Sequence, residues 1–256
     1  FRLSMDYVDI KGDVTVFNGA LQLNIKEARK ADEGTYIESD YMPTSQKDIE
    51  EMYAELTSII LSMKNEYLLK LTRRFFIDDK DFAAKFKRHS AAKRVHHGFV
   101  GGLLEHTLGV TKLCVTLADN YPYLNRDLLI TAAVFHDIGK VYELSSFPEN
   151  DYTDAGQLLG HIVMGCEIIG RAVSEIEGFP VVLARELKHC VLAHHGEFEY
   201  GSPKKPALIE AVALHYADDI DAKLETFKEA LNAPGAQAGE WLGFNKMLDS
   251  NIRSTI

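Results

Sequence analysis

The stretch "AAVFHDIGKVYEL", residues 132–144, places a histidine–aspartate pair directly after an apolar run. The apolar residues predict a buried helix, and His136 and Asp137 stand at its end. A charged group in a protein core is costly unless it is paired or binds a metal ion. The pair therefore predicts that other polar side chains reach the same part of the core.

Four further helical segments carry histidine or aspartate at positions that face a core. These residues are His106 in "GGLLEHTLGV", His161 in "LLGHIVMG", His194 and His195 in "VLAHHGE", and Asp218 in "LHYADDIDAK". Each one alone is better explained as a hydrogen-bonded core residue. Five helices together predict a shared metal site, which helical bundles build from inward-facing side chains. Imidazole with carboxylate suits Mn, Fe, Co or Zn better than Ca.

The composition is that of an ordinary globular protein, with 256 residues of which 46% are hydrophobic and 26% charged. No apolar run approaches the roughly 20 residues that cross a bilayer, so we expect no membrane span. Cys114, Cys166 and Cys190 lie far apart and form no CxxC pair. They predict buried thiols in a reducing cytoplasm rather than a disulfide framework.

The charge is unevenly distributed along the chain. The net charge of −10 argues against non-specific binding of nucleic acid by the whole surface. Residues 64–100, however, carry ten Lys/Arg and four Asp/Glu. This segment could hold a polyanionic ligand, and a solvated helical face is the alternative interpretation.

The first 43 residues have the alternation of β-strands. Val14 and Val16, then Leu21 and Leu23, alternate with polar residues around Asn18-Gly19, which predicts a hairpin with a type I′ turn. A single hairpin cannot cover its own apolar face. It therefore either packs on the rest of the chain or belongs to a larger β-domain.

From Thr44 onward the apolar residues recur with helical spacing, so the predicted fold is mainly α. Ser45 is the predicted N-cap of the first helix, with Asp48 three residues on. Further helices are expected near 100–119, 126–138, 157–177, 180–194 and 206–231. The predicted division is a β segment (1–43), a helical connector that is basic in its second half (44–95), a helical bundle domain (96–233) and a C-terminal tail (234–256).

The ordered histidines and aspartates resemble the HD superfamily of metal-dependent phosphohydrolases, whose signature is "HDIGK". The resemblance implies an all-helical domain that binds two metal ions. One ion would be held by His106, His136, Asp137 and Asp218. The second would be held by His161, His194 and His195, with Asp137 bridging both.

A closer resemblance covers nearly the whole chain. "HHGFVGGLLEHTL", "LLGHI", "LAHHGEFEYGSPKKP" and "LHYADDIDAK" are similar to segments of the YhaM-type 3′→5′ exoribonucleases of Gram-positive bacteria. In that family an OB-fold precedes the HD domain, and "IKGDVTVFNGALQLNIKEARKA" looks like its final strands. The earlier strands are absent and the chain begins with Phe1, so we expect a truncated protein with an intact catalytic domain.

The resemblance implies a cytoplasmic 3′→5′ exonuclease that cuts single-stranded RNA into nucleoside 5′-monophosphates by means of a metal-bound hydroxide. Manganese is the favoured ion, with Fe, Co and Zn open. Cleavage of DNA and the oligomeric state also stay open. A phosphohydrolase of small nucleotides or cyclic dinucleotides is the alternative, although the GYP element of cyclic-di-GMP enzymes does not follow "AHHGE". A non-catalytic nucleic-acid-binding module is the third candidate.

Several residues outside the ligand set are candidate substrate contacts. Lys140, one turn after Asp137 and part of the family motif, is expected to reach a phosphate oxygen. His97 is expected to contact the scissile phosphate or the leaving oxygen, and His96 is a weaker candidate. The resemblance places Ser202 and Lys204 in the substrate groove. Asp221 is expected to orient a metal-binding histidine, with a ribose contact as the alternative.

Overall fold

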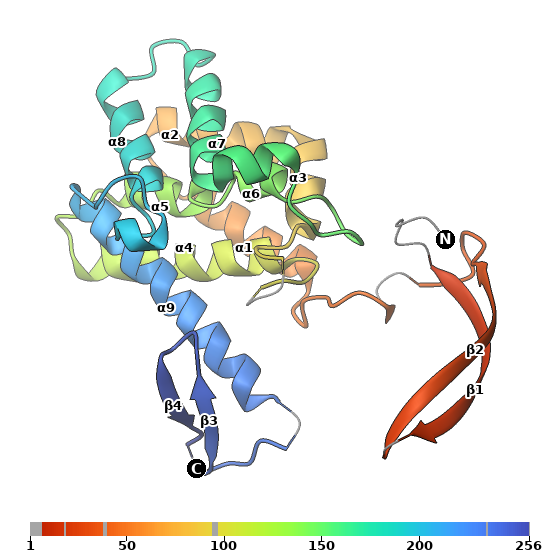
Figure 1. Ribbon diagram of the computed structural model, residues 1–256. Coiled ribbons are helices and arrows are strands. Elements are labelled where there is room, and N and C mark those ends of the chain that lie inside the picture. Colours follow the sequence, from red (N-terminus) through yellow and green to blue (C-terminus); the bar gives the residue numbers. More distant parts are fainter. Residues whose placement is uncertain (1–6, 18, 38–39, 94–96, 234, 256) are drawn as a thin grey trace.

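The computed structural model is mainly helical, as predicted, and describes residues 7–17, 19–37, 40–93, 97–233 and 235–255. The helices are α1 (Ile49–Leu61), α2 (Glu66–Arg73), η2 (Arg74–Asp78), α3 (Lys80–Arg88), α4 (Gly102–Asn120), α5 (Arg126–Phe135), α6 (Lys140–Glu143), α7 (Asp154–Ser174), α8 (Val181–Leu192), η3 (Phe198–Tyr200) and α9 (Ile209–Leu231). The strands are β1 (Val8–Phe17), β2 (Ala20–Lys30), β3 (Trp241–Asn245) and β4 (Ser250–Arg253). Figure 1 shows the helices gathered in one bundle, with β1 and β2 beyond its edge.

Helix α5 lies at the centre of the bundle. Every residue from Leu128 to Phe135 is buried, and α5 packs against α2, α4, α8 and α9. A helix that is apolar all round needs cover on every side. The chain therefore leaves α5 inside the protein, so that His136 and Asp137 emerge in the core.

The turn after α5 replaces the last part of the helix that the sequence predicts. That helix was expected to reach residue 138 but ends at Phe135, and residues 136–139 turn into the short α6. A Cβ atom on Gly139 would lie 2.0 Å from the carbonyl oxygen of His161. Gly139 is thus required where the turn meets α7, and this close approach brings His161 towards Asp137.

Helix α7 begins earlier than predicted and is broken inside. Thr153 is its N-cap and accepts a hydrogen bond from the backbone N–H of Gly156. Gly160 has φ 72° and ψ 156°, a backbone conformation that is essentially restricted to glycine. The break re-aims the backbone N–H of the next residue, His161, away from the helix axis.

The start of α1 corrects the predicted cap. The N-cap is Asp48, whose Oδ1 accepts hydrogen bonds from the backbone N–H groups of Glu50 and Glu51. Ser45 instead donates its hydroxyl proton to Glu105 Oε2 at 2.6 Å. Asp48, three residues after Ser45, is thus a better acceptor than Ser45 for the first helical N–H groups.

The N-terminal hairpin forms with the predicted pairing, and Val14 lies opposite Leu23 while Val16 lies opposite Leu21. Asn18, the first residue of the predicted turn, lies outside the described residues; Gly19 has φ 80°. The apolar side chains remain exposed, for example 69% for Val16 and 77% for Leu21. The hairpin therefore does not bury its apolar face on the helices, and its membership of a larger OB-fold stays a prediction.

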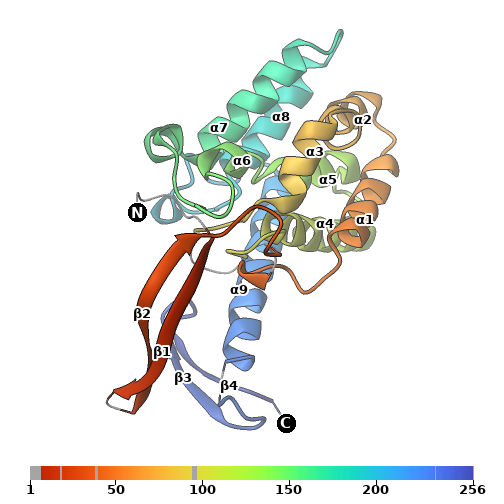
Figure 2. The same cartoon turned by 90° about the vertical axis from the view of Figure 1, so that its right-hand side faces the viewer.

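The C-terminal segment predicted as a tail contains a second hairpin. β3 and β4 pair antiparallel, with an irregularity in register between Trp241 and Gly243. Figures 1 and 2 both show this hairpin beside the C-terminal half of α9. Within the described residues, no helix is both long and apolar enough to span a membrane.

The three cysteine side chains differ in burial. Cys114 and Cys190 are buried and Cys166 is half-buried, and all three are free thiols, as predicted.

In the basic segment, residues 64–100, several cations are paired with carboxylates: Arg73 with Asp78, Arg74 with Glu175, Lys87 with Glu50 and Lys93 with Asp151. Much of its positive charge is therefore locally neutralised, which favours the solvated-face interpretation for these four residues.

Candidate metal centre

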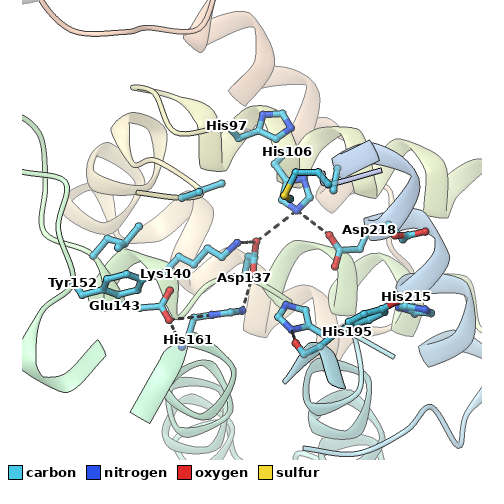
Figure 3. Close-up of a pocket in the computed structure, with 17 residues that line it drawn as sticks. His97, His106, Asp137, Lys140, Glu143, Tyr152, His161, His195, His215 and Asp218 are labelled. Carbon is cyan, nitrogen blue, oxygen red and sulfur yellow. Dashed lines mark hydrogen bonds and ion pairs between the residues drawn. The ribbon is translucent and has the colours of Figure 1, made fainter. Parts of the chain in front are cut away.

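A cavity of about 470 Å³ opens where α4, the α5–α6 turn, α7 and α9 meet. Figure 3 shows His106, Asp137, His161, His195 and Asp218 directed into it from different segments of the chain. His136 and His194, both fully buried, lie against these residues. The structure thus brings together all seven residues that the sequence singled out as metal ligands.

The first trio consists of His106, His136 and Asp218, from α4, the end of α5 and α9. His106 Nε2 lies 3.1 Å from His136 Nε2 and 3.1 Å from Asp218 Oδ1. His136 Nε2 lies 3.9 Å from the same carboxylate oxygen. One donor atom of each residue thus converges on a single point, a geometry that suits one cation.

The second trio consists of His161, His194 and His195. One ring nitrogen of each lies within 4.8 Å of the others. The Nε2 atoms of His161 and His194 are buried and have no hydrogen-bond partner among the described residues. Buried polar atoms are rarely left unpaired, so these two nitrogens indicate a ligand that the protein atoms do not supply.

Asp137 lies between the two trios. Its Oδ2 is 3.5 Å from His106 Nε2 and 3.4 Å from His136 Nε2. Its Oδ1 is 3.4 Å from His161 Nε2 and 3.8 Å from His194 Nε2, and this buried oxygen has no hydrogen-bond partner among the described residues. The carboxylate therefore offers one oxygen to each trio, as a bridging ligand must.

All five histidines of the trios use Nδ1 in the same way. Each Nδ1 faces an oxygen that can only accept a hydrogen bond, so each must donate a proton. The acceptors are Asp221 Oδ2 for His106 (2.7 Å), the Ala133 carbonyl for His136 (2.7 Å), Glu143 Oε1 for His161 (3.2 Å), the Val191 carbonyl for His194 (2.7 Å) and the Tyr200 carbonyl for His195 (2.8 Å). In its neutral form each imidazole would therefore present the lone pair of Nε2, the tautomer that binds metal.

The pKa values of His106 and Asp137 show how strongly this place favours positive charge. Burial lowers the pKa of His106, but hydrogen bonds to Asp218 and Asp221 outweigh burial and raise it to about 10. Burial raises the pKa of Asp137, but Lys140 and His136 hold it well below its usual range. The carboxylates around His106 thus favour a positive charge at this place.

Two histidines of the second trio, His194 and His195, favour the neutral imidazole. Burial lowers the pKa of His194 well below its usual value, and the neighbouring His195 and His136 lower it further. Burial likewise lowers the pKa of His195, with a second contribution from His161. Neutral imidazole is the form that coordinates an ion, so the lowered pKa values of His194 and His195 favour metal binding at these two rings.

Asp221 lies where its predicted orienting role requires. Its Oδ2 accepts from His106 Nδ1 at 2.7 Å and lies 3.2 Å from His97 Nε2. Burial raises the pKa of Asp221, but the hydrogen bonds with His106 and His97 outweigh it and lower the pKa. Asp221 thus fixes the ring of His106 through the nitrogen that faces away from the first trio.

Glu143 does the same for His161, and the sequence analysis missed it. Its Oε1 accepts from the backbone N–H of His161 at 2.9 Å and lies 3.2 Å from His161 Nδ1. The backbone contact depends on the break at Gly160, because an unbroken helix would direct that N–H along its own axis. Glu143 follows Asp137 by six residues, and its side chain faces His161 across the α6–α7 contact.

Lys140 and His97 both line the cavity. Lys140 Nζ lies 2.6 Å from Asp137 Oδ2. Burial lowers the pKa of Lys140, but Asp137 outweighs it and raises the pKa, so the side chain stays charged. His97 is 2% exposed and contacts Asp221, while His96 lies outside the described residues. Contact of either side chain with a phosphate stays a prediction.

Ser202 and Lys204 do not line this cavity, and their contact with substrate stays a prediction. Ser202 is 3% exposed, and its hydroxyl lies 3.0 Å from the Leu192 carbonyl and 2.8 Å from the Lys204 carbonyl. The hydroxyl thus braces the loop after α8. Lys204 is exposed outside the cavity lining, so its substrate contact remains a prediction without support from this geometry.

Other lining residues carried no sequence signal for this cavity. They are Tyr152, Tyr200, His215 and Met247, among others. His215, which the sequence analysis left outside the site, has Nδ1 2.9 Å from the His194 carbonyl. Met247 comes from the β3–β4 turn, so its position depends on a hairpin that the sequence analysis did not predict.

Comparison with known proteins agrees with this geometry. A family model described as "HD domain" matches residues 103–223. The chain belongs to the HD-domain family, and within it to the proteins related to YhaM. It is 39% identical over 227 residues to the 3′-5′ exoribonuclease YhaM of Geobacillus sp. (strain WCH70), covering 88% of this chain and 68% of that protein.

A second relative gives the same result. The 3′-5′ exoribonuclease YhaM of Bacillus velezensis is 39% identical over 228 residues, covering 88% of this chain and 70% of that protein. No solved structure gives a significant match to the chain. The histidine and carboxylate clusters fit the divalent cations that HD domains bind, because their unpaired Nε2 and Oδ1 atoms converge on shared points.

Proposed function

We propose that this protein is a metal-dependent 3′→5′ exoribonuclease that shortens single-stranded RNA and releases nucleoside 5′-monophosphates. The observation that carries the proposal is Asp137, which offers one carboxylate oxygen to each histidine-containing trio. The relatives named YhaM supply the reaction, and the donor atoms of the two trios supply a place for the ions it needs.

The proposed centre holds two divalent ions, with manganese as the favoured metal because imidazole and carboxylate together suit it. The first trio and Asp137 would hold one ion, and the second trio and Asp137 the other. Bound ions of this kind lower the pKa of water and neutralise phosphoryl oxygens. Asp221 and Glu143 keep the rings of His106 and His161 in the metal-binding orientation.

Lys140 and His97 are the proposed contacts for the substrate phosphate. Lys140 carries a positive charge on the cavity wall and can move from Asp137 to a phosphoryl oxygen, where it would stabilise charge that develops during cleavage. In Figure 3, His97 lies beyond His106 as seen from Asp137. His97 also lines the cavity, where it can donate a hydrogen bond. Neither contact requires the chain to form a covalent intermediate.

We assign catalysis to residues 96–233, a range that contains the HD-domain match at 103–223. Residues 1–43 and 44–95 remain a proposed β segment and helical connector. Action in the cytoplasm is part of the proposal, and the three free thiols support it.

The test is incubation of the purified protein with Mn²⁺ and 5′-labelled single-stranded RNA. A ladder that shortens from the 3′ end, with nucleoside 5′-monophosphates as products, is the expected result. EDTA should stop the reaction. Asp218→Asn should also stop it, whereas Asp119→Asn serves as the matched control, because that exposed carboxylate on α4 lies outside the cavity lining.

Parallel samples contain single-stranded DNA and a cyclic dinucleotide. Turnover of the cyclic dinucleotide without turnover of RNA would replace the proposal by a small-nucleotide phosphohydrolase. RNA binding without cleavage of any substrate, in protein that carries metal, would favour a non-catalytic binding module.

A further inference from the structure

The hairpin β3–β4 adjoins the cavity although no catalytic role is assigned to it. Met247, in the turn between the strands, lines the cavity. Figure 1 shows the turn directed towards the helical bundle, while the open end of the hairpin points away from it. The hairpin therefore extends outward from the mouth of the cavity.

A β-bulge places two aromatic side chains on the same face of this hairpin. Trp241 lies opposite Arg253 and Phe244 lies opposite Asn251, with the register shifted between Trp241 and Gly243. Residues 251 and 253 share one face because side chains alternate along a strand. Their partners Trp241 and Phe244 therefore share it too, although in a regular strand residues three apart would face opposite ways.

The two faces of the hairpin differ sharply in exposure. Ile252, which points to the opposite face, is 4% exposed, whereas Trp241 is 69% and Phe244 is 59% exposed. Asn251 and Arg253 are exposed as well. One face is thus packed, and the other presents two aromatic rings, an amide and a guanidinium group to solvent.

We propose that this face, the hairpin platform (Trp241, Phe244, Asn251 and Arg253), stacks the bases of a single-stranded RNA whose 3′ end lies in the cavity. The inference rests on the proposed exonuclease function and adds a binding site to it. Aromatic rings stack on any base, which suits an enzyme that must hold every sequence in turn. Arg253 can bind the phosphates between the stacked bases.

Continuity with the cavity identifies RNA as the occupant. An exonuclease that cuts at the 3′ end needs to hold the nucleotides on the 5′ side of the scissile bond outside the catalytic cavity. The platform meets the cavity through Met247 and continues away from it. Phe244 is closer to the turn than Trp241, so the base nearest the cavity would stack on Phe244.

Trp241 gives a direct binding signal, because it is the one tryptophan in the sequence. The full chain is titrated with single-stranded oligouridylate in EDTA, which prevents hydrolysis, while tryptophan emission is recorded. Saturable quenching is the expected result. Unchanged emission, although the RNA binds by anisotropy of a fluorescent label, would overturn the proposal.

Substitutions then measure how much the platform contributes. Trp241→Ala and Phe244→Ala should each weaken RNA binding by roughly 5-fold to 100-fold, the range expected for loss of one stacked base. Trp241→Phe should restore most of the affinity, because it keeps an aromatic ring. Tyr123→Ala is the matched control, since Tyr123 is also 69% exposed but lies outside the cavity lining.

Kinetics separate stacking from a merely structural effect. In Mn²⁺, Trp241→Ala should raise KM for RNA more than it lowers kcat, and the loss should grow from a dinucleotide to a hexanucleotide. A uniform loss of kcat with a lowered Tm would show that the side chain supports folding instead. Unchanged RNA binding together with a changed elution volume would show that the face contacts a second copy of the chain.

The experiments distinguish failure of the hairpin platform from failure of the proposed exonuclease function. If wild-type protein binds RNA through Trp241 but cleaves none in Mn²⁺, the exonuclease proposal fails and the platform stands. If wild-type protein cleaves RNA and both alanine variants match it in affinity and KM, the platform fails and the exonuclease proposal stands. Absence of RNA binding by wild-type protein overturns the platform as well.

Discussion

Lys140 Nζ lies 2.6 Å from Asp137 Oδ2, which is the carboxylate oxygen that faces the first trio. A lysine cation at this distance competes with a metal ion for the same oxygen. Lys140→Gln should therefore leave the metal content unchanged or raised. Activity on RNA should nevertheless fall by about 100-fold or more, because a charge that stabilises the transition state is lost.

Metal analysis and steady-state kinetics on Lys140→Gln check this prediction together. Lys223→Gln, which removes an exposed lysine that pairs with Asp219, is the control and should behave like wild-type protein. Loss of bound metal in Lys140→Gln would show that the lysine supports the ligands rather than the substrate.

Glu143 is expected to control ion affinity at the second trio. Glu143→Ala removes the acceptor of both the backbone N–H and Nδ1 of His161. Loss of such an outer contact typically weakens metal binding by about 10-fold to 100-fold. Calorimetric titration with Mn²⁺ should show one weakened site and one unchanged site, and Glu143→Gln should weaken binding less, because its amide oxygen still accepts. Equal weakening of both sites would contradict this assignment.

Gly160 is expected to couple the backbone of α7 to the same site. Its φ of 72° and ψ of 156° strain any other residue, so Gly160→Ala should lower the free energy of unfolding by roughly 1–3 kcal/mol. It should also weaken ion binding by moving His161 away from Glu143. Thermal unfolding with and without Mn²⁺ measures both effects.

Gly165→Ala provides the control for Gly160→Ala in the same helix. A Cβ atom there would lie 3.5 Å from the nearest atom, a methyl group of Ile138, which is an ordinary contact. This variant should be as stable as wild-type protein or more stable by up to about 1 kcal/mol. If both glycine variants lose stability equally, the strain at Gly160 is not the cause.

The three cysteines are expected to be unreactive in the folded protein at pH 8. Burial raises the pKa of Cys166 to about 11 and of Cys190 to about 12, and it raises the pKa of Cys114 as well. Only the thiolate reacts with disulfide reagents, so labelling requires a pH near these raised pKa values or unfolding. In native protein we expect slow labelling that begins at Cys166. In denaturant we expect labelling of all three thiols. Rapid labelling of native protein would contradict the burial.

The seven proposed ligands could be singled out from the sequence because their signal is local. Each one is a histidine or aspartate within or directly after an apolar helical run, as in "AAVFHD", and the apolar face of such a run lies in the core. By contrast, the positions of the Asp137 oxygens that face the two trios depend on the turn at residues 136–139, and the apolar pattern predicted helix as far as residue 138.

The features that the sequence analysis missed depend on contacts between distant segments. Glu143 reaches His161 only because Gly139 permits the close approach of α7. The β3–β4 hairpin was missed because its bulge at Leu242 breaks the alternation that identifies strands. The substrate contact of Ser202 stays a prediction, and its hydroxyl lies within hydrogen-bond distance of two backbone carbonyls, a local contact that no sequence pattern reveals.

The central claim is that Asp137 serves two ions at once, and metal content tests it most directly. Metal analysis after saturation with Mn²⁺ and removal of free ions compares wild-type protein, Asp137→Asn and His195→Ala, with circular dichroism to verify folding. We expect two ions per chain in wild-type protein, a loss confined to one ion in His195→Ala, and loss at both sites in Asp137→Asn. Retention of both ions and of RNA cleavage by folded Asp137→Asn would contradict the claim.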